Sequence, residues 1–312
     1  MRTSDSLRKT YGETLVELGK DNKAIVLMEA DLGNSTMSSL FAAAYPERYF
    51  QMGIAEQNMA STAAGLSLTG KIPFINSFAV FASGRAYDQI RSSITIADLN
   101  VKICGSSAGL SDYGDGKTHQ SIDDIALMQV LPHMTVLSPC DAVETEQMVK
   151  AMVEHKGPVY IRINRNDLPV VSDPAAEYHI GKMTEVVGGT DAVIFATGVM
   201  VQQSMAAAEL LKAEGVSVRV VNVSTIKPLD KDALLGYCEG VRGVVTAEEH
   251  STIGGLGSVV CQALSKSKLP VEMLGVDDRY GTSAENYDIL LRHYGLEPKD
   301  VAQKVRDVLS SK

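Results

Sequence analysis

The chain has 312 residues, of which 45% are apolar and 21% charged; this is ordinary globular material and long enough for about two domains. Its net charge of −9 includes no basic run, which argues against nucleic acid or an anionic membrane surface as a partner. No apolar stretch is long enough to span a membrane, and residues 1–15 lack the apolar core of a signal peptide, so we expect a cytoplasmic protein.

Short β-branched runs alternate with helical stretches in the first half of the chain. Strands are predicted at 24–30, 101–107, 135–139 and 158–163, and helices are predicted to begin near Glu56, Arg85, Ile122 and Asp141. Such alternation is typical of parallel sheets covered by helices. It predicts an α/β domain over residues 1–170.

A second α/β domain is predicted over residues 191–312. Between the two domains, residues 171–190 lose their hydrophobic periodicity and gather prolines and a glycine pair, which indicates a linker. Beyond it, strands at 191–198, 216–223 and 243–249 and a helix at 202–215 give a βαβ pattern. The predicted fold class is therefore two consecutive α/β domains with mostly parallel sheets.

The first candidate for chemistry is Glu56, in the sequence GIAEQNM, where it opens an alanine-rich helical stretch. A helix N-terminus favours the ionised carboxylate, whereas apolar walls disfavour it, and a carboxylate in such surroundings needs a partner. From its residue type alone, Glu56 is either an acid at the start of a helix or a buried functional group.

The second candidate is the segment GLSDYGDGKTHQSIDD, residues 109–124, which follows a predicted strand. Ligands of α/β proteins bind at the carboxyl ends of parallel strands, so this loop is a candidate binding site; a polar surface loop with helix caps is the alternative. The acidic and histidine side chains of the loop are Asp112, Asp115, His119, Asp123 and Asp124.

Phe78 and Phe81 are three residues apart and are by themselves more typical of core.

Other features carry less. The six histidines show no metal-ligand spacing, so no metal site is predicted in this chain. The glycines at 254–257 precede a helix but do not open the first βα turn, which makes them a weak dinucleotide fingerprint, and His250 in EEHSTIGG has no assigned role. The cysteines form no Cys-x-x-Cys pair and are expected to be reduced thiols; they are Cys104, Cys140, Cys238 and Cys261.

Four motifs occur together along the chain: GIAEQNM, FAVFASG, GDGKTHQ and NRNDLP. In this order and at these separations, the first half resembles the pyrimidine-binding domain of transketolase-family thiamine diphosphate enzymes. The second half resembles the C-terminal domain of the same family. The likeness spans nearly the whole chain, and it is strongest to the C-terminal subunits of split transketolases.

The resemblance implies thiamine diphosphate as the cofactor. Glu56 matches the catalytic carboxylate that hydrogen-bonds the aminopyrimidine ring, and Phe78 and Phe81 match aromatic residues that pack against that ring. The third aromatic residue of this motif is replaced here by Gly84. Asp31 aligns with a family aspartate near the cofactor.

The resemblance also assigns substrate contacts. Asp115 and His119 match residues that hold the hydroxyl and carbonyl groups of a ketose donor, and an imidazole at this position is suited to proton transfer. Arg165 matches an arginine that grips the substrate phosphate, with Arg8 and Ser35 as its companions. A planar guanidinium suits that task because it pairs with phosphate oxygens through two hydrogen bonds.

Two departures bear on the donor and on the assembly. Ser107 stands where many transketolases have a histidine, which leaves open a branched donor such as apulose 4-phosphate. The family binds Mg²⁺ and the diphosphate through Gly-Asp-Gly and an Asn about thirty residues later. The copy at 114–116 lacks that Asn and lies in the substrate loop. The resemblance therefore implies a separate N-terminal subunit that mainly holds Mg²⁺, in an α2β2-type assembly.

The expected function is transfer of a two-carbon ketol unit from a ketose phosphate to an aldose acceptor, in a heteromer that is active only when complete. The alternatives are an enzyme like the β subunit of 2-oxo acid dehydrogenases, an enzyme like deoxyxylulose phosphate synthase, and a non-catalytic binding partner that kept the fold.

Overall fold

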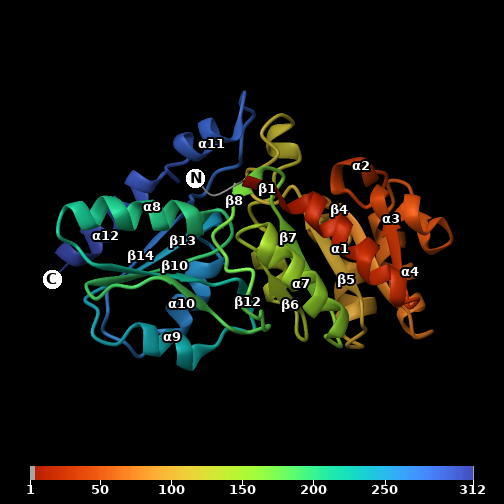
Figure 1. Cartoon of the computed structure of the whole chain (residues 1–312), viewed down its shortest axis with the longest axis horizontal. Helices are drawn as coiled ribbons and strands as arrows, with labels where there is room; N and C mark the ends of the chain where they lie inside the picture. The colour runs from red at the N-terminus through yellow and green to blue at the C-terminus, as the bar shows by residue number, and fades with distance from the viewer. Residues whose placement is uncertain (1–3, 312) are drawn as a thin grey trace.

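A computed structural model describes residues 4–311 and shows two sheets arranged along the long axis of the molecule (Figure 1). Most neighbouring strands within each sheet run parallel, and helices cover both faces, which confirms the predicted fold class. Within residues 4–311, no helix is both long and apolar enough to cross a membrane.

The first sheet has seven strands, and all neighbouring pairs are parallel except the one that includes β12. From edge to edge its strands are β12 (Thr225–Lys227), β6 (Thr135–Leu137), β7 (Val159–Ile163), β5 (Lys102–Ser106), β4 (Ile72–Phe78), β2 (Ile25–Glu29) and β3 (Tyr49–Gln51).

The second sheet has five strands, with an antiparallel strand at one edge. Its order is β14 (Val271–Val276), β13 (Val244–Ser251), β10 (Ala192–Ala196), β11 (Val218–Asn222) and β9 (Thr184–Val187). A small antiparallel pair, β1 (Ser4–Ser6) with β8 (Asp167–Pro169), ties the start of the described chain to the segment after β7.

Helical segments connect the strands of both sheets. In the first half they are α1 (Leu7–Asp21), α2 (Gly33–Thr36), α3 (Ser39–Ala44), η1 (Pro46–Arg48), α4 (Glu56–Ser67), η2 (Phe81–Arg85), α5 (Tyr87–Gln89), η3 (Ile90–Thr95), η4 (Gly116–Thr118), α6 (Asp124–Gln129) and α7 (Ala142–Glu154). In the second half they are α8 (Met200–Ala213), α9 (Lys231–Tyr237), α10 (Leu256–Ala263), α11 (Tyr287–His293) and α12 (Pro298–Ser310).

Side-chain alternation along the strands builds two core layers, one on each face of the sheets. On β2, Leu27 belongs to the layer that includes α1 and α7, and Met28 belongs to the layer under α4. On β10, Ile194 and Phe195 divide in the same way, between the layer of α8 and α12 and the layer of α9 and α10, and these helix pairs lie on opposite faces in Figure 1. Each layer thus continues across both halves of the chain.

The boundary between the halves is less simple than the sequence pattern indicates. The predicted linker 171–190 contains β9, which pairs with β11 and so belongs to the second sheet. In the other direction, β12 from the second half pairs with β6 and forms an edge of the first sheet. The predicted linker therefore includes a four-residue edge strand, which the sequence pattern did not reveal because so short a strand with mixed burial carries little periodic signal.

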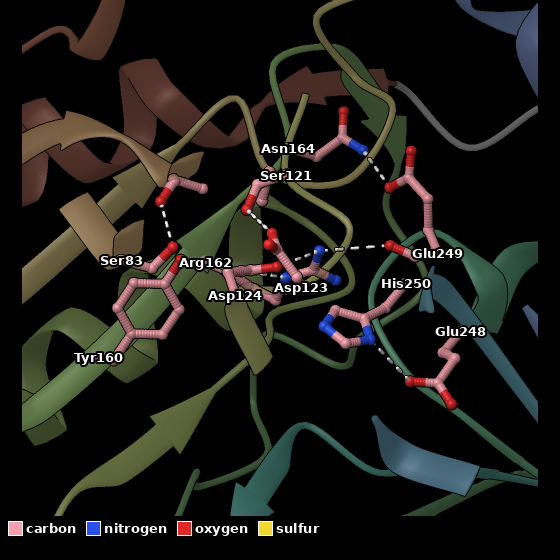
Figure 2. Close-up of polar contacts among 12 residues, drawn as sticks. Ser83, Ser121, Asp123, Asp124, Tyr160, Arg162, Asn164, Glu248, Glu249 and His250 are labelled. Carbon is pink, nitrogen blue, oxygen red and sulfur yellow. Dashed lines mark hydrogen bonds and ion pairs between the residues drawn. The ribbon is translucent and has the colours of Figure 1, made fainter. Parts of the chain in front are cut away.

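A buried polar cluster joins the two halves (Figure 2). Arg162 on β7 is paired with Asp124 at the start of α6, with its Nε 2.9 Å from Oδ2 and its Nη2 3.1 Å from Oδ1. Tyr160 donates to the same carboxylate at 2.8 Å, and Arg162 also donates to the main-chain oxygen of Glu249 on β13 at 3.3 Å. A buried charge is tolerated only when it is paired and hydrogen-bonded on all sides, so these contacts fix how the halves meet.

The Asp124→Asn variant tests the weight of this cluster. It leaves the buried guanidinium of Arg162 without its counter-charge, and we expect it to lower the free energy of unfolding by about 3 kcal/mol. Urea unfolding of the full chain measures the change. The control is Glu214→Gln, which breaks the exposed pair with Arg306 and should leave the unfolding midpoint in place. Equal effects of the two variants would contradict the role given to the buried pair.

Candidate active site

Most of the predicted site residues lie at one end of the first sheet, where its parallel strands have their carboxyl ends. Asp31 and Ser35 follow β2, Phe78 ends β4, loop 109–121 follows β5, and Arg165 follows β7. Glu56 begins α4, which follows β3 at the same edge. Parallel strands bring their carboxyl ends together, so residues far apart in sequence meet there.

Glu56 is almost wholly buried, with 3% of its surface exposed, and its partner is Arg85. The Oε1 atom of Glu56 lies 3.0 Å from Nη1 of Arg85. The Arg85 guanidinium also lies over the ring of Phe81, 3.9 Å from its centroid, and 47% of its side chain is exposed. Arg85 is the last residue of the π-helical segment η2, which begins at Phe81. Helical structure therefore begins before the predicted start near Arg85, and α5 follows at Tyr87. Such π segments are frequent at functional sites.

The two phenylalanines form a stacked pair and are joined by His119. Their ring centroids are 6.1 Å apart with an interplanar angle of 16°. His119 meets Phe81 edge to face at 5.3 Å and Phe78 at 6.1 Å. Asp115 precedes the short turn η4 that leads to His119, and its side chain is exposed. Phe78 is buried, as a core residue is, but its position beside His119 places it in the site as well.

Arg8, Ser35 and Arg165 are brought together by hydrogen bonds. Arg8 donates from Nη1 to the main-chain oxygen of Ser35 at 2.6 Å and from Nε to that of Arg165 at 3.0 Å. Arg165 in turn pairs with the buried Asp112, Nη1 to Oδ2, at 2.9 Å. Burial and the nearby charge of Arg165 lower the pKa of Arg8, while Asp167 and Asp112 oppose the shift. Two neighbouring guanidinium groups with one buried carboxylate make a site suited to an anion.

Asp31 lies in a loop organised by a buried carboxylate, Glu29. Glu29 accepts hydrogen bonds from the main-chain nitrogen of Leu32 at 3.2 Å and from the hydroxyl of Thr36 at 2.8 Å. Burial raises the pKa of Glu29 to about 6, and these hydrogen bonds oppose the shift. Asp31 itself is exposed and has a positive φ of 64°. The structure therefore places Asp31 at the edge of the site without joining it to Glu56 or Phe78.

Ser107 is buried and has a strained backbone conformation. Its φ is 54°, and its hydroxyl has no hydrogen-bond partner among the described residues, as is also true of the hydroxyls of Ser77 and Ser106. Unpaired buried hydroxyls and a left-handed non-glycine residue are features that cluster at ligand sites. Together with a buried carboxylate beside stacked rings, they fit an aromatic, polar cofactor such as thiamine diphosphate.

The acidic loop does not act as one cluster. His119 contacts the two phenylalanines and Asp115 is exposed, whereas Asp112 is paired with Arg165 and Asp124 with Arg162. Between residues 4 and 311, no group of three or more His, Cys, Asp or Glu side chains is arranged to hold a metal ion. The sequence pattern did not single out Arg85; a basic residue directly after the FAVFASG motif was the only available signal.

Comparison with known proteins gives two family matches. Residues 4–171 match the family model described as "Transketolase, pyrimidine binding domain". Residues 181–301 match the model described as "Transketolase, C-terminal domain".

Individual relatives cover nearly the whole chain. A protein of Methanocaldococcus jannaschii named "Putative transketolase C-terminal section" is 42% identical, over 96% of this chain and 95% of the relative. The 6-deoxy-6-sulfo-D-fructose transketolase subunit SqwH of Clostridium sp. is 38% identical, over 98% and 95%. One of the subunits of the apulose-4-phosphate transketolase of Phocaeicola vulgatus is 35% identical, over 95% of each chain.

A solved structure described as "Split gene transketolase, inactive beta4 tetramer" has the same fold. It superposes with a TM-score of 0.89 at 46% sequence identity, and the match covers 99% of both chains.

Substitutions at Ser107 test the strain at the site. Ser107→Gly removes both the left-handed penalty and the unpaired hydroxyl, and we expect a net gain of about 1 kcal/mol in the free energy of unfolding after the cost of glycine flexibility. Ser107→Ala removes only the hydroxyl and should give a smaller gain. Urea unfolding of both variants provides the measurement. A loss of stability in Ser107→Gly would show that neither the left-handed backbone nor the unpaired hydroxyl of Ser107 destabilises the fold.

Proposed function

The chain belongs to the transketolase family, and from this premise we propose that it supplies the pyrimidine-binding half of a thiamine diphosphate site completed by a separate subunit. Its close relatives are named as C-terminal sections or subunits of transketolases, and the chain is accordingly a C-terminal transketolase subunit, part of a ketol-transferring enzyme. The residue roles, the metal and the assembly that follow are our proposal.

The observation that carries the proposal is one continuous set of contacts. Glu56 pairs with Arg85, Arg85 lies on Phe81, Phe81 stacks with Phe78, and His119 touches both rings. The carboxylate, the aromatic rings and the imidazole to which the family resemblance gives roles toward cofactor and substrate therefore belong to one chain of contacts. A structural protein has no need to gather these groups at the carboxyl ends of its strands.

Within this site each residue has a distinct task. Glu56 is placed to hydrogen-bond a ring nitrogen of the cofactor, once Arg85 releases it, and the two phenylalanines supply an apolar surface for the ring. Thiamine diphosphate supplies the electron sink for carbon–carbon bond cleavage. His119 and the exposed Asp115 are placed to hold the hydroxyl and carbonyl oxygens of the donor, and His119 to exchange a proton with it. Asp31 lines the edge of the cofactor site.

The anion site indicates a charged donor. Arg8 and Arg165 leave guanidinium N–H groups without a partner among the described residues, and such groups bind phosphate or sulfonate oxygens well. The relatives act, by their names, on a sulfofructose and on apulose 4-phosphate, so the charged end of the donor differs among subunits of this kind. We propose a ketose with an anionic end as donor and an aldose as acceptor.

A partner subunit is the second part of the proposal. The Gly-Asp-Gly sequence at 114–116 lies in the substrate loop, with Gly116 packed on Ser283, so we assign Mg²⁺ and the diphosphate mainly to the partner. Just before Glu56, the large apolar side chains of Ile54 and Phe50 are 73% and 41% exposed, which suits a covering chain. The related structure described as an inactive β4 tetramer supports an assembly that needs a second polypeptide, and we propose an α2β2 arrangement.

We also place the assembled enzyme in the cytoplasm. All four cysteines are free thiols, three of them buried and Cys261 partly exposed, which suits a reducing compartment.

The Glu56→Gln variant tests the role of the carboxylate. The amide still accepts a hydrogen bond from Arg85, so folding should be unaffected, but the loss of the charged acceptor should lower kcat for ketol transfer by about 100-fold or more. The measurement is ketose-dependent aldose consumption by the complete enzyme, with the exposed Glu47→Gln as the matched control. Ketol transfer near the normal rate by Glu56→Gln would remove Glu56 from the mechanism. Oxidative decarboxylation of pyruvate by the wild type would reassign the reaction.

The Arg165→Ala variant tests the anion site. We expect the KM for phosphorylated or sulfonated donors to rise about tenfold, with thiamine diphosphate affinity nearly unchanged. Because the substitution also leaves Asp112 buried without its partner, the double variant Arg165→Ala with Asp112→Asn separates the two effects. It should recover the stability of the fold but not the KM. A KM that stays at the wild-type value would assign Arg165 to structure alone.

A further inference from the structure

The residues EEH at 248–250 lie where strand β13 departs from a regular ladder. The register between β13 and β14 shifts over residues 247–251, and irregularities of this kind re-aim side chains. Glu248 accepts hydrogen bonds from the main-chain nitrogens of Leu256 at 2.6 Å and Gly257 at 2.8 Å, at the N-terminus of α10. The glycine-rich segment is therefore satisfied within the chain. Glu249 is directed instead at the first half of the molecule (Figure 2).

The carboxylate of Glu249 is held by two groups of the first half and by the hydroxyl of Tyr287 from its own half. Its Oε1 accepts a hydrogen bond from the main-chain nitrogen of Leu110 at 2.8 Å, and its Oε2 lies 3.4 Å from Nδ2 of Asn164. The residue is 4% exposed, and burial raises the pKa of Glu249 to about 7 against the opposing charge of Arg162. A buried carboxyl group of the second half thus binds the backbone of the loop that carries His119.

The contact lies at the base of that loop. Gly109 and Ser121 exchange main-chain hydrogen bonds of 2.8 and 3.0 Å, which close the loop, and Leu110 is the next residue. Gly109 has a φ of 66°, and a Cβ atom there would overlap the carboxyl group of Glu249. The close approach therefore requires glycine at this position, and Glu249 fills the space that the missing side chain leaves.

The same half of the chain also holds the loop further along. Gln120 donates from Nε2 to the main-chain oxygen of Thr282 at 3.0 Å, and the main-chain nitrogen of Ala284 donates to the oxygen of Tyr113 at 2.9 Å. The segment between β14 and α11 thus supports the loop where Glu249 does not reach.

We propose that Glu249 is a positioning residue: from the second half of the chain it fixes loop 109–121, and so sets His119 against the phenylalanine pair. What the loop does rests on the proposed function; the contact itself does not. His119 already meets both rings, so a shift of about 1 Å at the loop base would displace the imidazole from the donor oxygens and slow the reaction. The second half is then part of the catalytic apparatus without touching the substrate.

Three variants of the full chain separate this role from general stability. Glu249→Leu has no acceptor for the Leu110 N–H, whereas Glu249→Gln keeps an amide oxygen in its place. Glu248→Leu is the matched control, because Glu248 is also a buried glutamate that accepts main-chain hydrogen bonds, but it accepts them from Leu256 and Gly257 at α10 rather than from the loop.

Hydrogen exchange followed by mass spectrometry on the chain alone gives a readout that does not depend on activity. In Glu249→Leu, amides of peptides spanning 109–121 should exchange about tenfold faster, as expected for one lost buried hydrogen bond, and Glu249→Gln should restore the wild-type rate. In Glu248→Leu the faster exchange should appear at 255–263. Unchanged exchange of 109–121 in Glu249→Leu, or equal loosening of that loop in Glu248→Leu, would overturn the proposal.

Kinetics of the enzyme completed by its partner subunit give the second readout. Glu249→Leu should lower kcat about tenfold with the half-saturating thiamine diphosphate concentration unchanged, Glu249→Gln should recover it, and Glu248→Leu should match the wild type. If the wild-type enzyme showed no ketol transfer, the proposed function would be contradicted. The hydrogen-exchange data would still test whether Glu249 holds loop 109–121. If Glu249→Leu does not fold, Gln120→Leu serves instead; it removes the hydrogen bond to Thr282 of the second half together with those to Leu110 and Asp112 within the loop. It should show the same faster exchange of 109–121 and the same loss of kcat, and unchanged exchange would overturn the role of the second half.

Discussion

The packing of the two halves against each other depends on the hydrogen bonds of the buried Arg162 guanidinium. The guanidinium is bound through two atoms by Asp124 at the start of α6, and it donates to the backbone of Glu249 on β13. A charged group in the interior is stable only while each of these partners stays in place. Directional hydrogen bonds, and not apolar packing alone, therefore fix how the two halves meet. The loop after β5 is held against the same part of β13 through Glu249.

The site itself is assembled from charges that are already paired within the chain. Arg85 pairs with Glu56, and Asp112 pairs with Arg165, so the buried carboxylate of Glu56 and the guanidinium of Arg165 each have a counter-charge within the chain. In the proposed function, these ion pairs are exchanged for contacts with the cofactor or the donor when those bind. Affinity in this half of the site is then a difference between two sets of charged hydrogen bonds, and it depends on what a covering subunit adds.

Much of this arrangement could be predicted from local sequence. Parallel α/β folding follows from alternating β-branched and helical runs. Glu56, Phe78 and His119 stand out because the motifs that contain them resemble a known family in their order and separations. The rest depends on long-range contacts that leave little trace in a pattern. β12 is three residues long and joins a sheet formed by the other half of the chain, and the π-helical segment η2 differs from an α-helix by its hydrogen-bond spacing alone. Likewise, Glu249 acts through a backbone N–H 139 positions away, which no spacing rule could reveal.

The most direct test of the central claim is reconstitution. The tagged chain is purified from its source cells together with any stoichiometric partner, and the two polypeptides are then separated and recombined with Mg²⁺ and thiamine diphosphate. Ketol transfer from an anionic ketose to an aldose is measured for each polypeptide alone and for the mixture. We expect ketol transfer only in the mixture. Full activity of this chain alone, or a mixture that binds the cofactor yet transfers no ketol unit from any anionic ketose, would contradict this expectation.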